Sequence, residues 1–171
     1  MKLIVCALAD LQRVYDVRRP AGVISLLSPH QVTPDLSDDP PRLVHRFNDI
    51  AEPMEGMIAP TPDMVADLLT FAGAFPDQAT LLLHCWMGVS RSPAAAFILA
   101  CAFSEEGREA RIAAALRQAS PSATPSPFLV RLADEQLGRN GRMEAAIHAI
   151  GRGREASSGD PFELETSGWG A

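Results

Sequence analysis

The sequence predicts an α/β fold with a mostly parallel central sheet flanked by helices. Short apolar runs typical of buried strands alternate with helical patterns in the first half of the chain, and helical patterns dominate the second half. The 171 residues, 47% of them hydrophobic, are enough for one substantial core. We therefore expect a single domain over residues 1–150, followed by a tail over residues 151–171 that is rich in glycine, serine and charge.

Four segments have the character of strands. Residues 2–7 and 22–27 are mostly apolar, and the second, GVISLL, carries no charge, as expected of a strand covered on both faces. Residues 43–47 mix apolar and polar side chains, and the apolar run at 80–83 forms the fourth strand. Between them, residues 28–42 contain four prolines and three aspartates, which predicts a surface loop.

Helical patterns fill most of the remaining chain. A short helical or turn segment is expected at 10–18, and Thr61, Pro62 and Asp63 give a hydroxyl N-cap, a first-turn proline and a first-turn acid to a helix that ends near residue 75. Further helices are predicted at 93–103, 108–119, 126–137 and 142–150. In the segment 126–137, Ser126 is expected to be the N-cap and Pro127 the first helical residue.

Charge and cysteine usage exclude several classes of protein. The net charge is −6 and no basic block is present, so we expect no nucleic-acid partner. Cys6, Cys85 and Cys101 lack zinc spacing, and an odd number of cysteines suits a reducing compartment. The apolar run at residues 3–9 is too short to span a bilayer and lacks a basic start. These observations predict a cytoplasmic protein without membrane attachment.

Residues 84–92, HCWMGVSRS, form the most informative stretch, because they lie between a predicted strand and a predicted helix. Such a loop directs backbone N–H groups and the positive end of the helix at one point, where an anion of phosphate size binds. Arg91 is placed to hold the anion as a bidentate fork, with Cys85 beneath it. The same field favours the thiolate form of cysteine, which is the nucleophile. The alternative is that Cys85 is a small buried apolar residue.

The pattern His84-Cys85, Gly88 and Arg91-Ser92 resembles the HCxxGxxRS loop of the cysteine-based protein tyrosine phosphatases, and GVSRS is most similar to the dual-specificity branch. The resemblance covers residues 24–137 and implies a dual-specificity phosphatase-like fold. It also implies that residues 1–150 are a catalytic domain that hydrolyses phosphomonoesters through a phosphocysteine intermediate, without a metal or cofactor. One departure is Pro125-Ser126, where this family commonly has proline and asparagine.

The resemblance assigns roles within the loop. Cys85 is the nucleophile, and Arg91 holds the equatorial phosphate oxygens together with the backbone of the preceding residues. These substrate-binding residues are Trp86, Met87, Gly88, Val89 and Ser90. Ser92 is expected to hydrogen-bond the departing sulfur, or else to serve only as an N-cap. His84 orders the cysteine backbone in the family; the other interpretation is a merely packed histidine.

The resemblance also implies a general acid on a loop upstream of the cysteine. Asp49 is the favoured candidate because it follows the strand that ends at Phe47. Glu52 and Glu55 share its loop and remain rivals, whereas Asp63 and Asp77 are better explained as a helix-start residue and a turn former.

Trp86 and Met87 form an apolar lip, which favours a phosphotyrosine or phosphoserine protein, or a small aryl phosphate, over an inositol phosphate; alternatively, Trp86 packs under a neighbouring loop. A rhodanese-type enzyme fits Gly88 and Ser90-Arg91-Ser92 less well, and low-molecular-weight phosphatases carry their loop near the N-terminus. A catalytically weak or inactive phosphate-binding module remains the alternative of another class. Cys101 is too far along its helix to pair with Cys85, whereas Cys6 is left as either a buried thiol or a disulfide partner.

Overall fold

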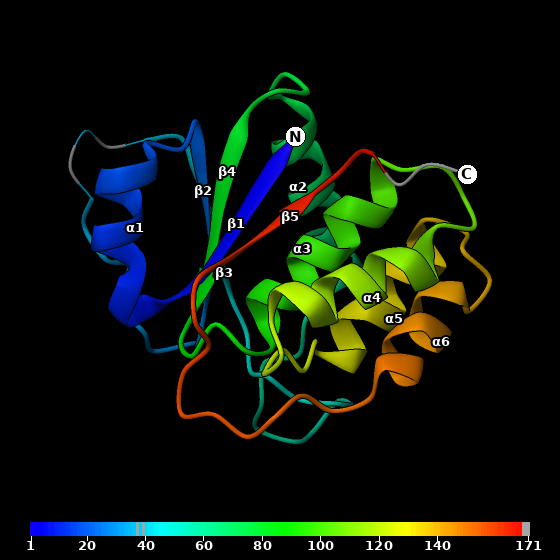
Figure 1. Cartoon of the computed structure of the whole chain (residues 1–171). Helices are drawn as coiled ribbons and strands as arrows, with labels where there is room; N and C mark the ends of the chain where they lie inside the picture. Colours follow the sequence, from blue (N-terminus) through cyan, green and yellow to red (C-terminus); the bar gives the residue numbers. More distant parts are fainter. Residues whose placement is uncertain (37, 39, 169–171) are drawn as a thin grey trace.

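A five-stranded sheet forms the centre of the computed structural model (Figure 1), which describes residues 1–36, 38 and 40–168. The strands are β1 (Lys2–Ala7), β2 (Gly22–Leu27), β3 (Arg42–Arg46), β4 (Thr80–Cys85) and β5 (Phe162–Glu165), in the spatial order β3-β2-β4-β1-β5. The first four strands are parallel, and only β5 runs antiparallel to its neighbour β1. The predicted α/β fold with a mostly parallel sheet is therefore confirmed.

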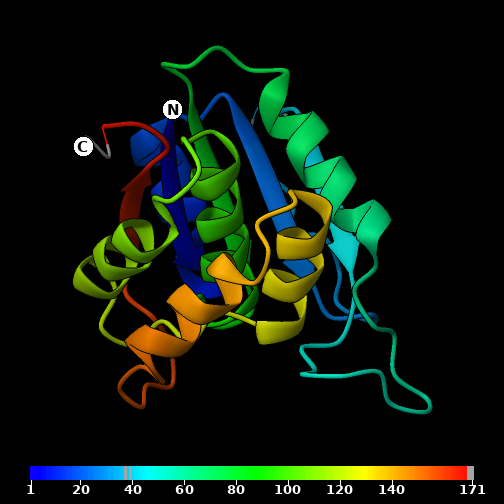
Figure 2. The same cartoon turned by 90° about the vertical axis from the view of Figure 1, so that its right-hand side faces the viewer.

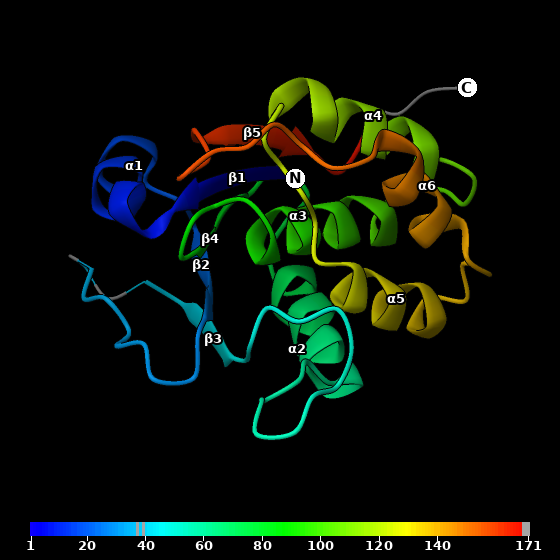
Figure 3. The ribbon, with the colours of Figure 1, turned by 90° about the horizontal axis from the view of Figure 1, so that it is seen from below.

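Helices cover both faces of this sheet. A short 3-10 turn (Leu8–Asp10) and α1 (Leu11–Arg18) lie on one face, and five helices lie on the other (Figures 2 and 3). These five are α2 (Pro62–Gly73), α3 (Arg91–Ala102), α4 (Glu109–Ala119), α5 (Pro127–Gln136) and α6 (Arg142–Ile150). Each predicted helix is present, with one difference that matters for the site: α3 begins at Arg91 and not at Pro93.

Alternation along β1 divides the core into two parts. Leu3 and Val5 pack toward the five-helix face, whereas Ile4 and Cys6 pack toward α1, as the two-residue period of a strand requires. On the larger side, α3 is buried over almost its whole length, which explains why its sequence is nearly all apolar. The cysteine loop therefore joins two fully buried elements, β4 and α3, and both of its ends are held rigidly.

The expected tail contains regular structure. After α6 the chain passes beneath the helices and returns to the sheet, where Phe162–Glu165 pairs with β1 as strand β5 (Figure 1). Phe162 and Leu164 are buried and Glu163 is exposed, so the strand has the alternation of a half-covered edge. The expectation of an irregular tail is thus wrong for these four residues. The sequence alone leaves open whether the tail residue Trp169 docks or stays free, and Trp169 lies outside the described residues.

No helix within the described ranges combines the length and the apolar character needed to cross a membrane.

Candidate active site

Residues 86–90 form a tight loop between the end of β4 and the start of α3. Gly88 has a φ of +69°, a conformation that disfavours any side chain. A Cβ atom at Gly88 would also lie 2.7 Å from the Ala7 backbone nitrogen at the end of β1. The loop therefore packs directly on the neighbouring strand, and only glycine satisfies both conditions.

Backbone N–H groups from three surrounding segments hold this loop from outside. The carbonyl of Trp86 accepts a hydrogen bond from Leu8 N–H (3.2 Å), that of Met87 from Gly159 N–H (2.8 Å), and that of Val89 from Thr124 N–H (2.8 Å). The carbonyl of Ser90 accepts from Ser126 N–H at 3.4 Å. Among the described residues, no backbone N–H from 86 to 91 donates to another protein group outside regular secondary structure. These donors have no partner in the described structure and are available to an acceptor that enters the loop.

Cys85 ends β4 and is 2% exposed. Its sulfur accepts a hydrogen bond from the Ser92 hydroxyl at 3.1 Å. Ser92 lies inside α3 and is fully buried, and Ser90 occupies the N-cap position without a capping side-chain bond. The interpretation of Ser92 as an N-cap is therefore wrong, because the helix starts one residue before it. Its hydroxyl donates its hydrogen bond to the Cys85 sulfur.

Arg91 is the first residue of α3 and is only 5% exposed. Its Nη1 donates to the carbonyl of Phe47 at 3.2 Å, and its guanidinium carbon lies 5.9 Å from the centre of the Phe47 ring. Its Nε is buried and finds no hydrogen-bond partner within the part of the chain that the structure describes. A buried guanidinium donor without a partner carries an energetic cost unless an acceptor enters the site. An anion bound by the loop is the acceptor that fits.

A cavity of about 500 Å³ opens above the cysteine. Its walls come from the loop, from Asp49 after β3 and from Ser28 after β2; the lining residues are Ser28, Asp49, Cys85, Trp86, Met87, Val89, Ser90 and Arg91. Asp49 accepts a hydrogen bond from the Ser90 hydroxyl at 2.9 Å. Its rivals Glu52 and Glu55 are exposed and do not line the cavity. The structure thus brings Asp49 to the loop and leaves the two glutamates outside.

His84 lies one residue before the cysteine and is fully buried. Its Nε2 shares a hydrogen bond of 2.7 Å with the Ser25 hydroxyl on β2, while its Nδ1 has no partner in the described structure. Burial, and to a smaller extent the charge of Arg42, lowers the pKa of His84 to about 4. The ring is therefore neutral near pH 7. Its hydrogen bond to Ser25 links β4 to β2 beside Cys85.

The other predicted residues are also located. Trp86 is 59% exposed and Met87 is 37% exposed, so Trp86 is not packed under a neighbouring loop and both form an apolar lip. Cys6 and Cys101 are buried free thiols. Burial raises the pKa of Cys6 to about 12, with a smaller contribution from Asp10. Cys6 faces the α1 side of the sheet and Cys85 the opposite side, which disfavours a disulfide between them.

Ser126 has the predicted position at the start of α5, but its side chain does not cap the helix. It occupies the N-cap position of α5 and Pro127 follows in the first turn, but the Ser126 hydroxyl makes no capping bond and is buried without a partner. Its only link to the loop that the structure gives is the long backbone bond to Ser90. At this position, the serine that replaces asparagine contributes no side-chain hydrogen bond to the loop.

Several partners of the site were not predicted from the sequence. Ser25 is on β2, Ser28 and Phe47 directly follow β2 and β3, and Gly159 comes from the segment before β5. In the described ranges, no three histidine, cysteine, aspartate or glutamate side chains gather in a way that could hold a metal ion.

Comparison with solved structures identifies the fold as that of a dual-specificity phosphatase. The crystal structure of DUSP15 aligns with a TM-score of 0.64 and 17% sequence identity, covering 91% of this chain and 94% of that chain. The Yvh1 phosphatase domain from Chaetomium thermophilum aligns with a TM-score of 0.47 and 18% identity, covering 86% of this chain and 88% of that one. No protein-family model matches the chain, and no curated protein matches it in sequence.

Proposed function

We propose that this protein is a metal-independent phosphomonoester hydrolase that works through a phosphocysteine intermediate. The observation that carries the proposal is the arrangement of Cys85 and Arg91 in one cavity, where the Arg91 Nε is buried and unpaired and the loop N–H groups are free. A phosphate monoester supplies three equatorial oxygens for these donors and a phosphorus atom for the sulfur.

In the first step, the Cys85 sulfur attacks phosphorus, so that an S–P bond forms and the P–O bond to the leaving group breaks. Asp49, which lines the same cavity, donates a proton to the departing ester oxygen. The charge that develops on the equatorial oxygens is stabilised by Arg91 and by the backbone N–H groups of residues 86–91.

In the second step, water attacks the phosphocysteine, the S–P bond breaks and inorganic phosphate leaves. Asp49, now ionised, accepts a proton from this water. The sulfur departs as a thiolate, and the Ser92 hydroxyl already donates to it at 3.1 Å. A hydrogen bond to the charged form makes the sulfur a better leaving group.

The proposed substrates are phosphotyrosine or phosphoserine proteins or small aryl phosphates. Trp86 and Met87 offer apolar surface at the mouth of the cavity, and neither brings a charge. Such a lip suits an aromatic or aliphatic side chain that bears the phosphate. The three buried free thiols fit a reducing compartment, so we place the protein in the cytoplasm.

Hydrolysis of p-nitrophenyl phosphate tests the proposal. The assay covers mildly acidic to neutral pH, with a chelator present and the Cys85→Ser variant alongside. We expect activity that survives the chelator and is lost in the variant. If freshly reduced wild-type protein is inactive but still binds phosphate or vanadate in a titration, the alternative of a phosphate-binding module replaces the hydrolase.

A further inference from the structure

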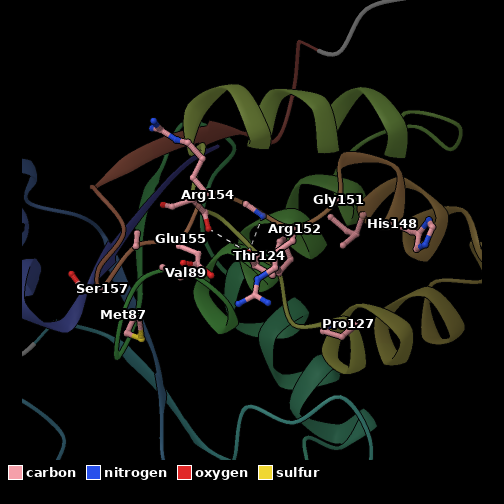
Figure 4. A pocket seen from close by; sticks show the side chains of 15 residues that line it. Met87, Val89, Thr124, Pro127, His148, Gly151, Arg152, Arg154, Glu155 and Ser157 are labelled. Carbon is pink, nitrogen blue, oxygen red and sulfur yellow. Dashed lines mark hydrogen bonds between the residues drawn. The ribbon is translucent and has the colours of Figure 1, made fainter.

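A second and larger cavity adjoins the catalytic one (Figure 4). Its volume is about 960 Å³, against about 500 Å³ above Cys85, and the two cavities share Met87 and Val89 as lining residues. Its other walls are residues 122–127, the end of α6 and the segment 151–157 that leads toward β5. We call this second cavity the flanking groove. Because the two cavities meet at Met87 and Val89, a substrate whose phosphate binds above Cys85 can continue past these residues into the groove.

Arg152 is the arginine of the groove whose side chain extends into it. It is exposed, and among the described residues it makes no ion pair or hydrogen bond. Figure 4 shows its side chain extending into the groove, whereas the side chain of Arg154, two residues later, extends away toward α4. Glu155 is the only carboxylate among the described lining residues. Arg152 is therefore positioned to bind an anion inside the groove.

The backbone on both sides of Arg152 is held in place. Arg117 Nη2 donates to the carbonyl of Gly151 at 2.7 Å, and Gly153 N–H donates to the Thr124 hydroxyl at 3.1 Å. Arg154 N–H donates to the carbonyl of Pro121 at 2.9 Å. The backbone that carries Arg152 is thus ordered before any ligand binds, which reduces the entropic cost of using its side chain.

The remaining lining favours an extended chain over a small molecule. Val89, Pro127 and Ile147 give apolar surface, and the volume is much larger than one aryl phosphate needs. The chain as a whole has a net charge of −6, so general attraction for anions is absent and recognition must be local. A peptide with apolar and anionic side chains beside its phosphorylated residue matches both the apolar surface and the Arg152 guanidinium that extends into the groove.

We propose that the flanking groove binds the peptide segment next to the phosphorylated residue, and that Arg152 selects substrates with an anionic group in that segment. The inference rests on the proposed phosphatase activity and specifies its substrate class. The anionic group is either a carboxylate side chain or a second phosphate, since an arginine fork pairs with both.

The test compares four substrates with the wild-type protein, Arg152→Gln and the matched control Arg154→Gln. The substrates are p-nitrophenyl phosphate and three phosphopeptides of one sequence. The first peptide has neutral flanks. The second is a set of peptides in which one aspartate is placed at each flanking position in turn. The third carries a second phosphate in place of that aspartate. We expect kcat/KM for the best anionic peptide to exceed that of the neutral peptide by about five- to tenfold. Arg152→Gln removes this preference and leaves p-nitrophenyl phosphate turnover unchanged, and Arg154→Gln retains the preference.

Each outcome decides a different claim. A preference of aspartate over the second phosphate, or the reverse, identifies the source of the anionic group. An unchanged preference in Arg152→Gln, or no preference in the wild-type protein despite turnover of p-nitrophenyl phosphate, overturns the inference and leaves the phosphatase intact. If p-nitrophenyl phosphate is not hydrolysed, the phosphatase proposal fails. In that case, fluorescence titration of the same peptides against the wild-type protein and Arg152→Gln decides whether the groove still selects the anionic ones.

Discussion

The Ser92 hydroxyl donates a hydrogen bond of 3.1 Å to the sulfur of Cys85, and both side chains are buried. In the proposed mechanism this sulfur leaves in the second step, and the Ser92 hydroxyl would stabilise it as it departs. We expect Ser92→Ala to slow breakdown of the phosphocysteine by about ten- to a hundredfold, because a hydrogen bond to a charged group contributes about 1.5–3 kcal/mol. Formation of the intermediate changes less.

Rapid mixing with p-nitrophenyl phosphate checks this expectation. A burst of p-nitrophenol before a slow steady state indicates an accumulated intermediate. Ser92→Cys keeps a weak hydrogen-bond donor, so we expect its rate of phosphocysteine breakdown to lie between those of the wild-type protein and Ser92→Ala. Loss of the burst together with a slow first step would assign Ser92 to nucleophile activation and not to the leaving sulfur.

Arg91 combines a hydrogen bond to the Phe47 carbonyl with an unpaired Nε. Lysine keeps the charge but has no planar fork, so it cannot hold a backbone carbonyl and two phosphate oxygens together. We expect Arg91→Lys to lower kcat for p-nitrophenyl phosphate by about a hundredfold or more. Thermal unfolding of the variant controls for loss of the fold. Turnover near the wild-type value in a folded variant would contradict the role of Arg91.

Asp49 lines the cavity, accepts a hydrogen bond from Ser90 and is the proposed general acid. An aryl oxide leaves readily without a proton, whereas an alkoxide does not. We expect Asp49→Ala to slow alkyl phosphate hydrolysis by about a hundredfold and aryl phosphate hydrolysis by much less. Glu52→Ala is the control, since Glu52 is on the same loop but does not line the cavity. Equal losses on both substrates would argue against a general acid.

The residues of the loop were predictable because their chemistry is local. Five residue types at fixed spacing, between a strand and an apolar helix, identify Cys85, Gly88 and Arg91 without knowledge of the rest of the chain. The central strands β2 and β4 were predictable for a similar reason, since each is mostly an apolar run. Asp49 was predicted only from its place after a strand, and Glu52 and Glu55 were alternative candidates. The structure shows that Asp49 lines the cavity and that the two glutamates do not.

Contacts between distant segments were not predictable. Strand β5 has only four residues and pairs Glu165 with Lys2, and the glycine- and serine-rich stretch before it masked its alternation. Nothing near Arg91 in the sequence indicates that it reaches the Phe47 carbonyl. The N-cap interpretation of Ser92 failed because α3 begins at Arg91, directly after the loop, and the sequence gives no sign of that earlier start.

His84 predicts a dependence of stability on pH. Burial, with a smaller effect of Arg42, lowers its pKa to about 4 from the usual 6.5. Between these values the unfolded chain binds a proton that the folded chain does not, so stability is full above about pH 6.5 and falls as the pH drops toward 4. The difference amounts to about 3 kcal/mol across the window.

Urea unfolding at several pH values across this window, for wild type and His84→Gln, measures the effect. Glutamine keeps a nitrogen donor for Ser25 and does not titrate. We expect the free energy of unfolding of the variant to change less with pH. His45, whose pKa burial also lowers, is present in both proteins, and its contribution cancels. Parallel pH profiles for the two proteins would exclude His84 as the source.

Gly159 holds the C-terminal segment against the cysteine loop. Its N–H donates to the Met87 carbonyl at 2.8 Å, and a Cβ atom there would lie 2.9 Å from the Gly88 carbonyl oxygen. Alanine at this position pushes the segment away from the loop, or the loop into the cavity. We expect Gly159→Ala to lower stability by about 1–3 kcal/mol. Turnover of p-nitrophenyl phosphate falls severalfold because the loop donors move.

Gly73→Ala is the matched control, because a Cβ atom at Gly73 meets nothing within 4 Å and alanine favours the helix that ends there. We expect this control to be neutral or slightly stabilising. Thermal unfolding and p-nitrophenyl phosphate kinetics of the two variants distinguish a local effect on the loop from a general cost of added volume. If Gly159→Ala loses stability but keeps full turnover, the segment supports the fold and does not position the loop.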